Sequence, residues 1–269
     1  STGLQTDLRT GLKKSLNLIS VRIVQELINP IDVKNTADRF DFRTPIQAVD
    51  AIALGVSEVI PLDITLAYSA LSYDGILHEP LSINSIKDRE GNIIENYLPT
   101  SKEVADEKTV FILRDMMKSV IDNGTGGSLR WKYKFYSPAA GKTGTTNNKT
   151  DAWFIGFTPE LVIGVWVGID NPEMKLGEKQ YGSKAALPIF AKTINKIYSL
   201  GDYYYLNNPI SLNSKADWEI PDGIVKKSIC KETCCLQTDW CESYYEYFLE
   251  ENVPTNQCEE YSNPLLRFK

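Results

Sequence analysis

The sequence predicts a mixed fold of the α/β or α+β class, in which helices cover an antiparallel sheet. Two observations point to this class. Segments with helical spacing alternate with short strands, and two β-branched and aromatic segments, 152–157 and 161–169, are joined by a tight turn at Thr158-Pro159-Glu160. Of the 269 residues, 42% are hydrophobic, so the chain can bury a sizeable core and is not disordered throughout.

The first predicted helix lies within residues 12–28. Apolar residues recur there every three or four positions, at Leu12, Leu16, Ile19, Ile23 and Leu27. Asn29-Pro30 is a stop signal for this helix. In an alternative interpretation, Ser15 and Asn17 cap a break between two short helices.

Three more elements follow before the middle of the chain. A helix begins at Pro61 and ends before Gly75. Residues 86–93 are typical of a hairpin turn between two short strands. A long helix is predicted over 102–122 and stops at Asn123-Gly124. Its inward positions are Val110, Leu113, Met117 and Val120.

The segment Asn123-Gly-Thr-Gly-Gly-Ser128 is rich in glycine. One interpretation is a phosphate-binding loop, but the spacing of that motif is missing. We therefore predict a flexible connector near a functional site. Further on, glycines within the two predicted strands indicate that another element packs closely over them: Gly156, Gly164 and Gly168. A last helix is predicted from Leu187 to Leu200, with Pro188 in its first turn.

The charge balance excludes some partners. The net charge is −6, from 29 basic and 35 acidic residues, which argues against broad nucleic-acid binding. No apolar stretch is long enough to span a bilayer, and residues 1–20 lack the pattern of a signal peptide. We therefore expect no nucleic-acid partner and no membrane contact from this segment itself.

The cysteines suggest a division of the chain. All five lie between Cys230 and Cys258, in an acidic region. Disulfides in an oxidising compartment explain this distribution best, because they staple segments too small to have their own core. Buried reduced thiols are an alternative, and zinc bound by Cys230, Cys234, Cys235 and Cys241 is a weaker one. We expect a body over 1–206 and an acidic, cysteine-rich appendage over 207–269.

The residues most suggestive of chemistry lie in Ala139-Ala-Gly-Lys-Thr-Gly-Thr-Thr-Asn-Asn148. Lys142 offers a compact positive charge to a carboxylate, and Thr143 and Thr145 offer hydroxyl groups. Gly144 lets a substrate backbone approach the strand closely. Together they predict an edge strand that binds a peptide and its carboxylate. The alternative is an edge strand protected by a charged residue.

These residues give the chain a resemblance to the penicillin-binding proteins, specifically to the C-terminal part of the transpeptidase domain of the class A, bifunctional members. The family has three motifs: Ser-x-x-Lys, Ser-x-Asn and Lys-Thr-Gly. Ser15-Leu16-Asn17 resembles the second motif, and Lys142-Thr143-Gly144 resembles the third. The similarity extends through Asp151-Ala-Trp-Phe-Ile-Gly-Phe-Thr-Pro159 to the cysteine-containing tail, and so covers nearly the whole chain.

The first motif does not precede Ser15. The chain's Ser-x-x-Lys is Ser228-Ile-Cys-Lys231, in the tail, which we interpret as chance. The resemblance therefore implies a fragment of a longer protein and a transpeptidase-like sheet whose leading strands are absent from this chain. The missing part is expected to supply the nucleophilic serine, a glycosyltransferase domain and a membrane anchor. The location implied is the extracytoplasmic face of the bacterial membrane.

The chemistry implied by the resemblance is acyl transfer from stem peptides of peptidoglycan that end in D-Ala-D-Ala, with β-lactams as inhibitors. Ser15 would relay a proton, Asn17 would orient the substrate amide, and Lys142 would bind the terminal carboxylate together with Thr143, Gly144 and Thr145. The backbone N–H of Thr145 would form half of an oxyanion hole. No cofactor and no metal are expected. Two other functions remain open: a non-catalytic module that binds peptidoglycan or a partner, and a D-Ala-D-Ala carboxypeptidase or β-lactamase.

Overall fold

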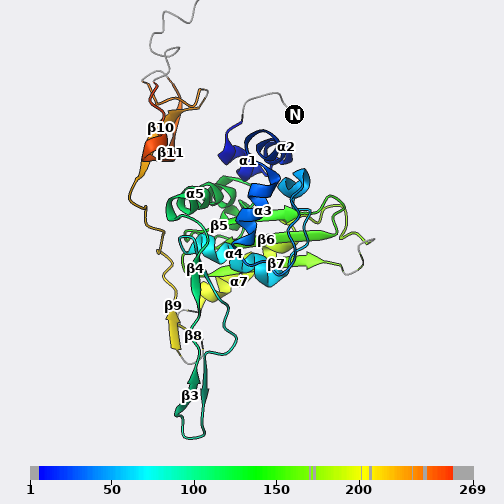
Figure 1. Ribbon diagram of the computed structural model, residues 1–269, viewed down its shortest axis with the longest axis vertical. Coiled ribbons are helices and arrows are strands. Elements are labelled where there is room, and N and C mark those ends of the chain that lie inside the picture. Colours follow the sequence, from blue (N-terminus) through cyan, green and yellow to red (C-terminus); the bar gives the residue numbers. More distant parts are fainter. Residues whose placement is uncertain are drawn as a thin grey trace, which may run out of the picture.

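The computed structural model describes residues 6–256, except for 170, 172–173, 201, 206–207, 232 and 239–240 (Figure 1). The helices are α1 (Leu8–Lys14), α2 (Asn17–Arg22), the π-helix η1 (Ile23–Leu27), α3 (Pro30–Asp38), the 3₁₀-helix η2 (Asp50–Leu54), α4 (Pro61–Ser72), α5 (Glu107–Asn123), α6 (Ser128–Trp131), α7 (Ala186–Ser199) and the 3₁₀-helix η3 (Glu250–Asn252). The strands are β1 (Ile76–His78), β2 (Ser85–Lys87), β3 (Ile93–Asn96), β4 (Ser101–Glu103), β5 (Ala140–Thr145), β6 (Asp151–Phe157), β7 (Val162–Gly168), β8 (Asp202–Tyr205), β9 (Asn208–Ser211), β10 (Ile224–Cys230) and β11 (Ser243–Leu249).

A three-stranded antiparallel sheet in the order β5-β6-β7 forms the centre of the body. Gly156 and Gly164 lie on opposite faces of it, because Gly164 is opposite Ile155 and successive residues alternate in direction. A Cβ atom on Gly156 would come within 2.6 Å of Phe190 in α7, and one on Gly164 within 2.1 Å of the Thr65 hydroxyl in α4. The two helices thus cover the two faces. This confirms the predicted fold class and explains both glycines. For Gly168 the prediction was wrong, because a Cβ atom there would meet the Trp166 ring of the same strand.

The start of the chain folds as two short helices rather than one. Ser15 ends α1 in the left-handed conformation, with φ 54°, and its backbone N–H bonds to the carbonyls of Gly11 and Leu12. The prediction of one helix over 12–28 was therefore wrong, and the alternative of a break at Ser15 is confirmed. Asn17 does not cap α2, because the residue before the helix is Leu16. Asn29 and Pro30 not only end the helical stretch but also begin α3, because the Asn29 side chain accepts a hydrogen bond from the Ile31 N–H.

The prediction of a helix from residue 102 was wrong at its start. Residues Ser101–Glu103 form β4, which pairs with β1 in antiparallel register. Helix α5 begins at Glu107, where the side chain of Asp106 accepts a hydrogen bond from the Thr109 N–H. The backbone groups of 101–103 that face β1 are satisfied by this partner strand instead of by a helical turn.

Two hairpins project from opposite ends of the molecule (Figure 1). The β2–β3 hairpin contains the turn predicted over 86–93. The β10–β11 hairpin lies in the predicted appendage, and its strands pair from Ile224 opposite Leu249 to Cys230 opposite Ser243. The boundary predicted between 206 and 207 lies outside the described residues.

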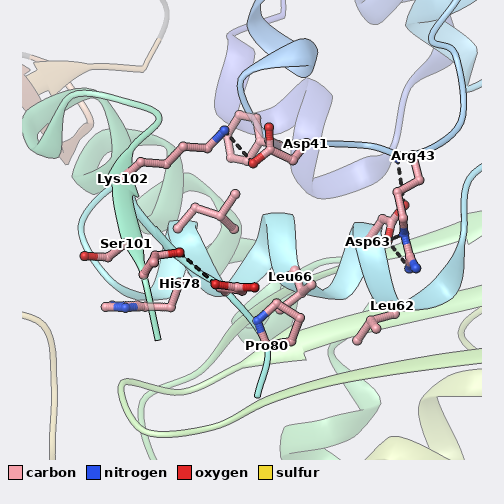
Figure 2. A pocket seen from close by; sticks show the side chains of 13 residues that line it. Asp41, Arg43, Leu62, Asp63, Leu66, His78, Pro80, Ser101 and Lys102 are labelled. Atoms are coloured by element: carbon pink, nitrogen blue, oxygen red, sulfur yellow. Dashed lines mark hydrogen bonds and ion pairs between the residues drawn. The ribbon is translucent and has the colours of Figure 1, made fainter. Parts of the chain in front are cut away.

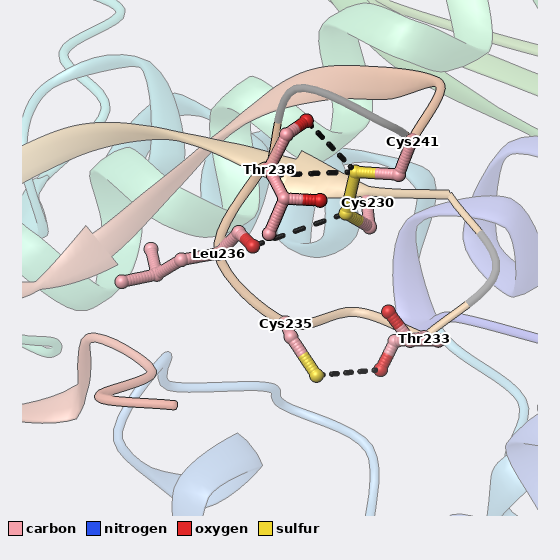
Figure 3. The surroundings of a disulfide bond; sticks show 6 residues. All are labelled: Cys230, Thr233, Cys235, Leu236, Thr238 and Cys241. Carbon is pink, nitrogen blue, oxygen red and sulfur yellow. Dashed lines mark hydrogen bonds between the residues drawn. A yellow bond between two sulfur atoms is a disulfide. The ribbon is translucent and has the colours of Figure 1, made fainter. Parts of the chain in front are cut away.

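A disulfide between Cys230 and Cys241 closes the loop that connects the two strands of this hairpin (Figure 3). Two of the four thiolates considered for zinc are thus in a disulfide bond. Cys234 and Cys235 carry free thiols, and Cys258 lies outside the described residues. The tail is therefore stapled, as predicted from the uneven placement of its cysteines.

The segment that leads into the hairpin runs back along the body. The Trp218 ring lies 5.7 Å from the Phe157 ring and 4.9 Å from the Arg114 guanidinium, measured to ring centroids. Its indole N–H donates to the Ser72 carbonyl at 2.9 Å. This tryptophan joins the tail to the packing between α4, α5 and β6. Across the part of the chain with described coordinates, no helix combines the length and hydropathy needed to cross a bilayer.

Candidate active site

The ammonium group of Lys142 donates a hydrogen bond to the Ser15 hydroxyl, with 2.7 Å between Nζ and Oγ. The two residues are 127 positions apart, and the fold joins the end of α1 to the edge strand β5. The Lys142 Nζ also donates to the Thr143 carbonyl at 2.9 Å. Burial lowers the pKa of Lys142 to about 8, because the charged form loses solvation. The two motifs singled out in the sequence thus share one polar centre.

The glycine-rich segment contacts the end of α1 at Lys13, two residues before Ser15. The Thr125 N–H donates to the Lys13 carbonyl at 3.2 Å, and a Cβ atom on Gly124 would come within 2.6 Å of that carbonyl oxygen. The hydroxyl groups of Thr125 and Thr143 are hydrogen-bonded at 2.7 Å. This segment therefore supports both Ser15 and β5. Its interpretation as a connector near a site agrees with these contacts, although Thr125 itself was not predicted.

A second support lies beside the far end of β5. The Gly182 N–H donates to the Thr145 hydroxyl at 3.0 Å. A Cβ atom on Gly182 would come within 2.5 Å of the Gly144 carbonyl and 2.3 Å of the Trp153 carbonyl, so only glycine fits there without displacement. A Cβ atom on Gly144 would lie 3.1 Å from that of Trp153. The close approach at Gly144 is therefore made by the neighbouring strand, and nothing in the sequence singled out Gly182.

Asn17 is the first residue of α2, and its side chain is exposed. This side chain makes no hydrogen bond to any of the described residues. The structure thus brings together Ser15, Lys142 and Thr143, with Gly144 and Thr145 next along the strand. The role of Asn17 stays a prediction.

This centre can bind an anion and move a proton. An ammonium group beside hydroxyl groups on an edge strand matches a carboxylate with backbone groups on either side. A lysine whose pKa is lowered to about 8 also supports proton transfer through the Ser15 hydroxyl. Within the ranges that the structure describes, no group of three histidine, cysteine or acidic side chains is arranged to hold a metal ion.

A cavity of about 520 Å³ lies elsewhere, between α4, β1 and β4 (Figure 2). Two ion pairs line it: Arg43 with Asp63, and Lys102 with Asp41. The Arg43 guanidinium lowers the pKa of Asp63. None of the six site residues predicted from the sequence is among the described residues that line this cavity. The candidate active site is therefore an open strand edge rather than this cavity.

Comparison with known families covers the chain in two parts. Residues 1–195 match the family described as penicillin binding protein transpeptidase domain. Residues 220–263 match the family described as penicillin-binding protein 1A, C-terminal domain. The first match contains every residue of the candidate site.

Individual relatives agree. The chain is 36% identical over 214 residues to penicillin-binding protein 1A of Rickettsia typhi, covering 71% of this chain and 27% of the relative. It is similar in structure to penicillin-binding protein 1A from Haemophilus influenzae, with a TM-score of 0.82 and 25% identity over 94% of this chain and 41% of that one. Penicillin-binding protein A from Mycobacterium tuberculosis, solved as an imipenem acyl-enzyme complex, shares the fold at a TM-score of 0.54 and 19% identity over 71% and 47%. The chain thus spans less than a third of the curated relative.

Proposed function

Because this chain belongs to the penicillin-binding protein transpeptidase family, we propose that it carries part of the active site of a serine D,D-transpeptidase. The reaction joins peptidoglycan stem peptides by acyl transfer from D-Ala-D-Ala. The observation that carries the proposal is the 2.7 Å hydrogen bond between Lys142 and Ser15, which joins two family motifs in one centre.

Each residue has a proposed task. The ammonium group of Lys142 binds the terminal carboxylate, with help from the Thr143 and Thr145 hydroxyl groups. Ser15 passes a proton to the departing D-alanine and takes one from the attacking amine. Gly144 offers its backbone groups to the peptide, and the Thr145 N–H polarises the reacting carbonyl. Asn17 orients the substrate amide.

In the proposed mechanism, the nucleophile comes from another part of a longer polypeptide. A serine hydroxyl attacks the penultimate D-Ala carbonyl and forms an ester, and the terminal D-alanine leaves with the proton. The amine of a second stem peptide then attacks the ester and releases the serine. We further propose that this polypeptide carries a glycosyltransferase and a membrane anchor, acts on the outer side of the cytoplasmic membrane, and is acylated by β-lactams.

Labelling of native membranes with a tagged penicillin tests the proposal. The adduct is sized and mapped by peptide sequencing. We expect it on a polypeptide well above the size of this chain, at a serine before Ser1, in a product that also contains Lys142. An adduct at Ser228 would overturn the placement of the nucleophile. Absence of any adduct would favour a non-catalytic binding module. In a parallel assay on stem peptides ending in D-Ala-D-Ala, release of free D-alanine without cross-links would favour a carboxypeptidase.

The pKa of Lys142 predicts the alkaline limit of the reaction. The cation binds the carboxylate, so the second-order rate constant of acylation should be constant below pH 8 and fall about tenfold per pH unit above it. The profile of the free enzyme, measured from pH 6 to 10 with a penicillin, checks this. A rate that stays level to pH 10 would show that the charge on Lys142 is not required.

A further inference from the structure

The side chain of Arg9 joins the tail of the chain to the helix that ends at Ser15. Its Nε donates to Glu246 in β11 at 2.8 Å, and Nη2 donates to the other oxygen of the same carboxylate. Nη2 also donates to the Asp115 carboxylate in α5 at 2.6 Å. The remaining group, Nη1, donates to the Asp115 carbonyl and to the Ser119 hydroxyl, each at 2.9 Å.

These groups are mostly shielded from water. The exposed fractions of the side chains are 16% for Arg9, 21% for Asp115 and 17% for Glu246. Burial alone would lower the pKa of Arg9, but the hydrogen bonds and charges of Glu246 and Asp115 raise it overall. An ion network of this kind, with a bidentate arginine, is geometrically more specific than an exposed pair.

Further contacts pack the same hairpin against α5 and stiffen the hairpin itself. The Tyr247 ring meets the Phe111 ring edge-to-face, with centroids 5.1 Å apart. A Cβ atom on Gly223, just before β10, would come within 2.7 Å of the Lys108 ammonium nitrogen. The Cys230–Cys241 disulfide closes the hairpin a few residues before Glu246. Strand β11 is therefore packed against α5 at Tyr247, next to Glu246, and the disulfide ties the start of the strand to β10.

Helix α1 has seven residues, and it is fixed at both ends. Arg9 anchors its first turn to α5 and β11, and the glycine-rich segment anchors its last turn at Lys13. Ser15 follows directly. A shift of this helix by a fraction of an ångström changes the distance between the Ser15 hydroxyl and Lys142, and catalytic rates are sensitive to displacements of that size.

We propose that the C-terminal hairpin, through Glu246, is a positioning element for Ser15. The hairpin then contributes to the rate of acyl transfer without touching substrate. This inference rests on the proposed function of Ser15 and Lys142, and it assigns a role to the tail that the family match does not supply.

The test uses the full-length protein and a chromogenic β-lactam, and it separates the dissociation constant of the reversible complex from the first-order rate constant of acylation. For Glu246→Ala we expect the acylation constant to fall about tenfold, while the dissociation constant changes less than twofold. The matched control is Glu242→Ala, in the same hairpin, whose carboxylate pairs with Lys231 in an exposed ion pair. We expect wild-type values for it.

A double-mutant cycle identifies the path of the effect. Arg9→Ala should lower the acylation constant by a similar factor, and the double variant with Glu246→Ala should lose little more than either single variant. Glu246→Gln, which keeps one acceptor oxygen for Arg9, should restore part of the rate. It also decides the case if Glu246→Ala fails to fold in a thermal melt.

Each outcome has one meaning. A wild-type protein that binds no β-lactam would contradict the proposed function itself. A wild-type protein that is acylated, with unchanged acylation in folded Glu246 variants, would overturn only the role of the hairpin. Equal losses in Glu246→Ala and Glu242→Ala would also overturn it, because the effect would then be general to the tail.

Discussion

Replacing Lys142 by alanine is expected to lower the second-order rate constant of penicillin acylation in the full-length protein about 100-fold. The ammonium group is partly buried, and it is bonded to the Ser15 hydroxyl and the Thr143 carbonyl. Its removal takes away a charge-assisted hydrogen bond to the carboxylate, and a loss of about 3 kcal/mol in transition-state stabilisation corresponds to that factor. Stopped-flow acylation and a cross-linking assay measure the two halves of the reaction.

The control for this variant is Lys149→Ala. Lys149 follows the same strand, but its Nζ donates to the Glu178 carbonyl. We expect its acylation rate to stay within twofold of wild type. An acylation rate that is unchanged in Lys142→Ala would contradict the proposed carboxylate site.

The largest expected loss of stability is that of Phe154→Ala. Phe154 is fully buried in β6, and its ring packs against that of Phe190 in α7, with centroids 4.7 Å apart. The cavity left by the truncation should reduce the free energy of unfolding by about 3–5 kcal/mol. Denaturant titration of the full-length protein, followed by loss of penicillin binding, measures the shift in midpoint.

Tyr136→Ala serves as the comparison, since its ring is 69% exposed. We expect this substitution to change the free energy of unfolding by no more than about 0.5 kcal/mol. Equal effects of the two variants would contradict the assignment of the β6–α7 contact as the core of the body.

The central part of the fold could be predicted because its signals are local. Strands β6 and β7 and helix α7 lie within a residue or so of their predicted bounds, since dense β-branched and aromatic runs and an N-terminal proline mark them clearly. The start of α5 could not be predicted in the same way. Whether Ser101–Glu103 continues a helix or forms a strand depends on β1, which lies far enough away in sequence to give no local signal.

The same holds for the candidate site: its motifs could be predicted from local sequence, but the contacts between distant residues could not. Ser15 and Lys142 stand out because each lies in a motif with a chemical rationale, but only the fold shows that they touch. Thr125 contacts the site through its hydroxyl group, and Gly182 through its backbone N–H. Isolated contacts of this kind leave no pattern in a sequence. The pairing of Arg9 with Glu246 could not be predicted, because the sequence around each residue looks like that around an ordinary exposed charged residue.

The separation of that pair, 237 positions, also bears on how the molecule is made. Arg9 is synthesised near the start of this chain and Glu246 near its end, so α1 can acquire its full set of partners only after β11 has been translated. Closing so long a loop is entropically costly, and contacts of this kind form late in folding. Strand β11, the last strand in the described part of the chain, thus completes the anchoring of α1. A chain that stops short of β11 leaves Arg9 with the partners in α5 alone, so this contact reports whether synthesis has run through the final hairpin.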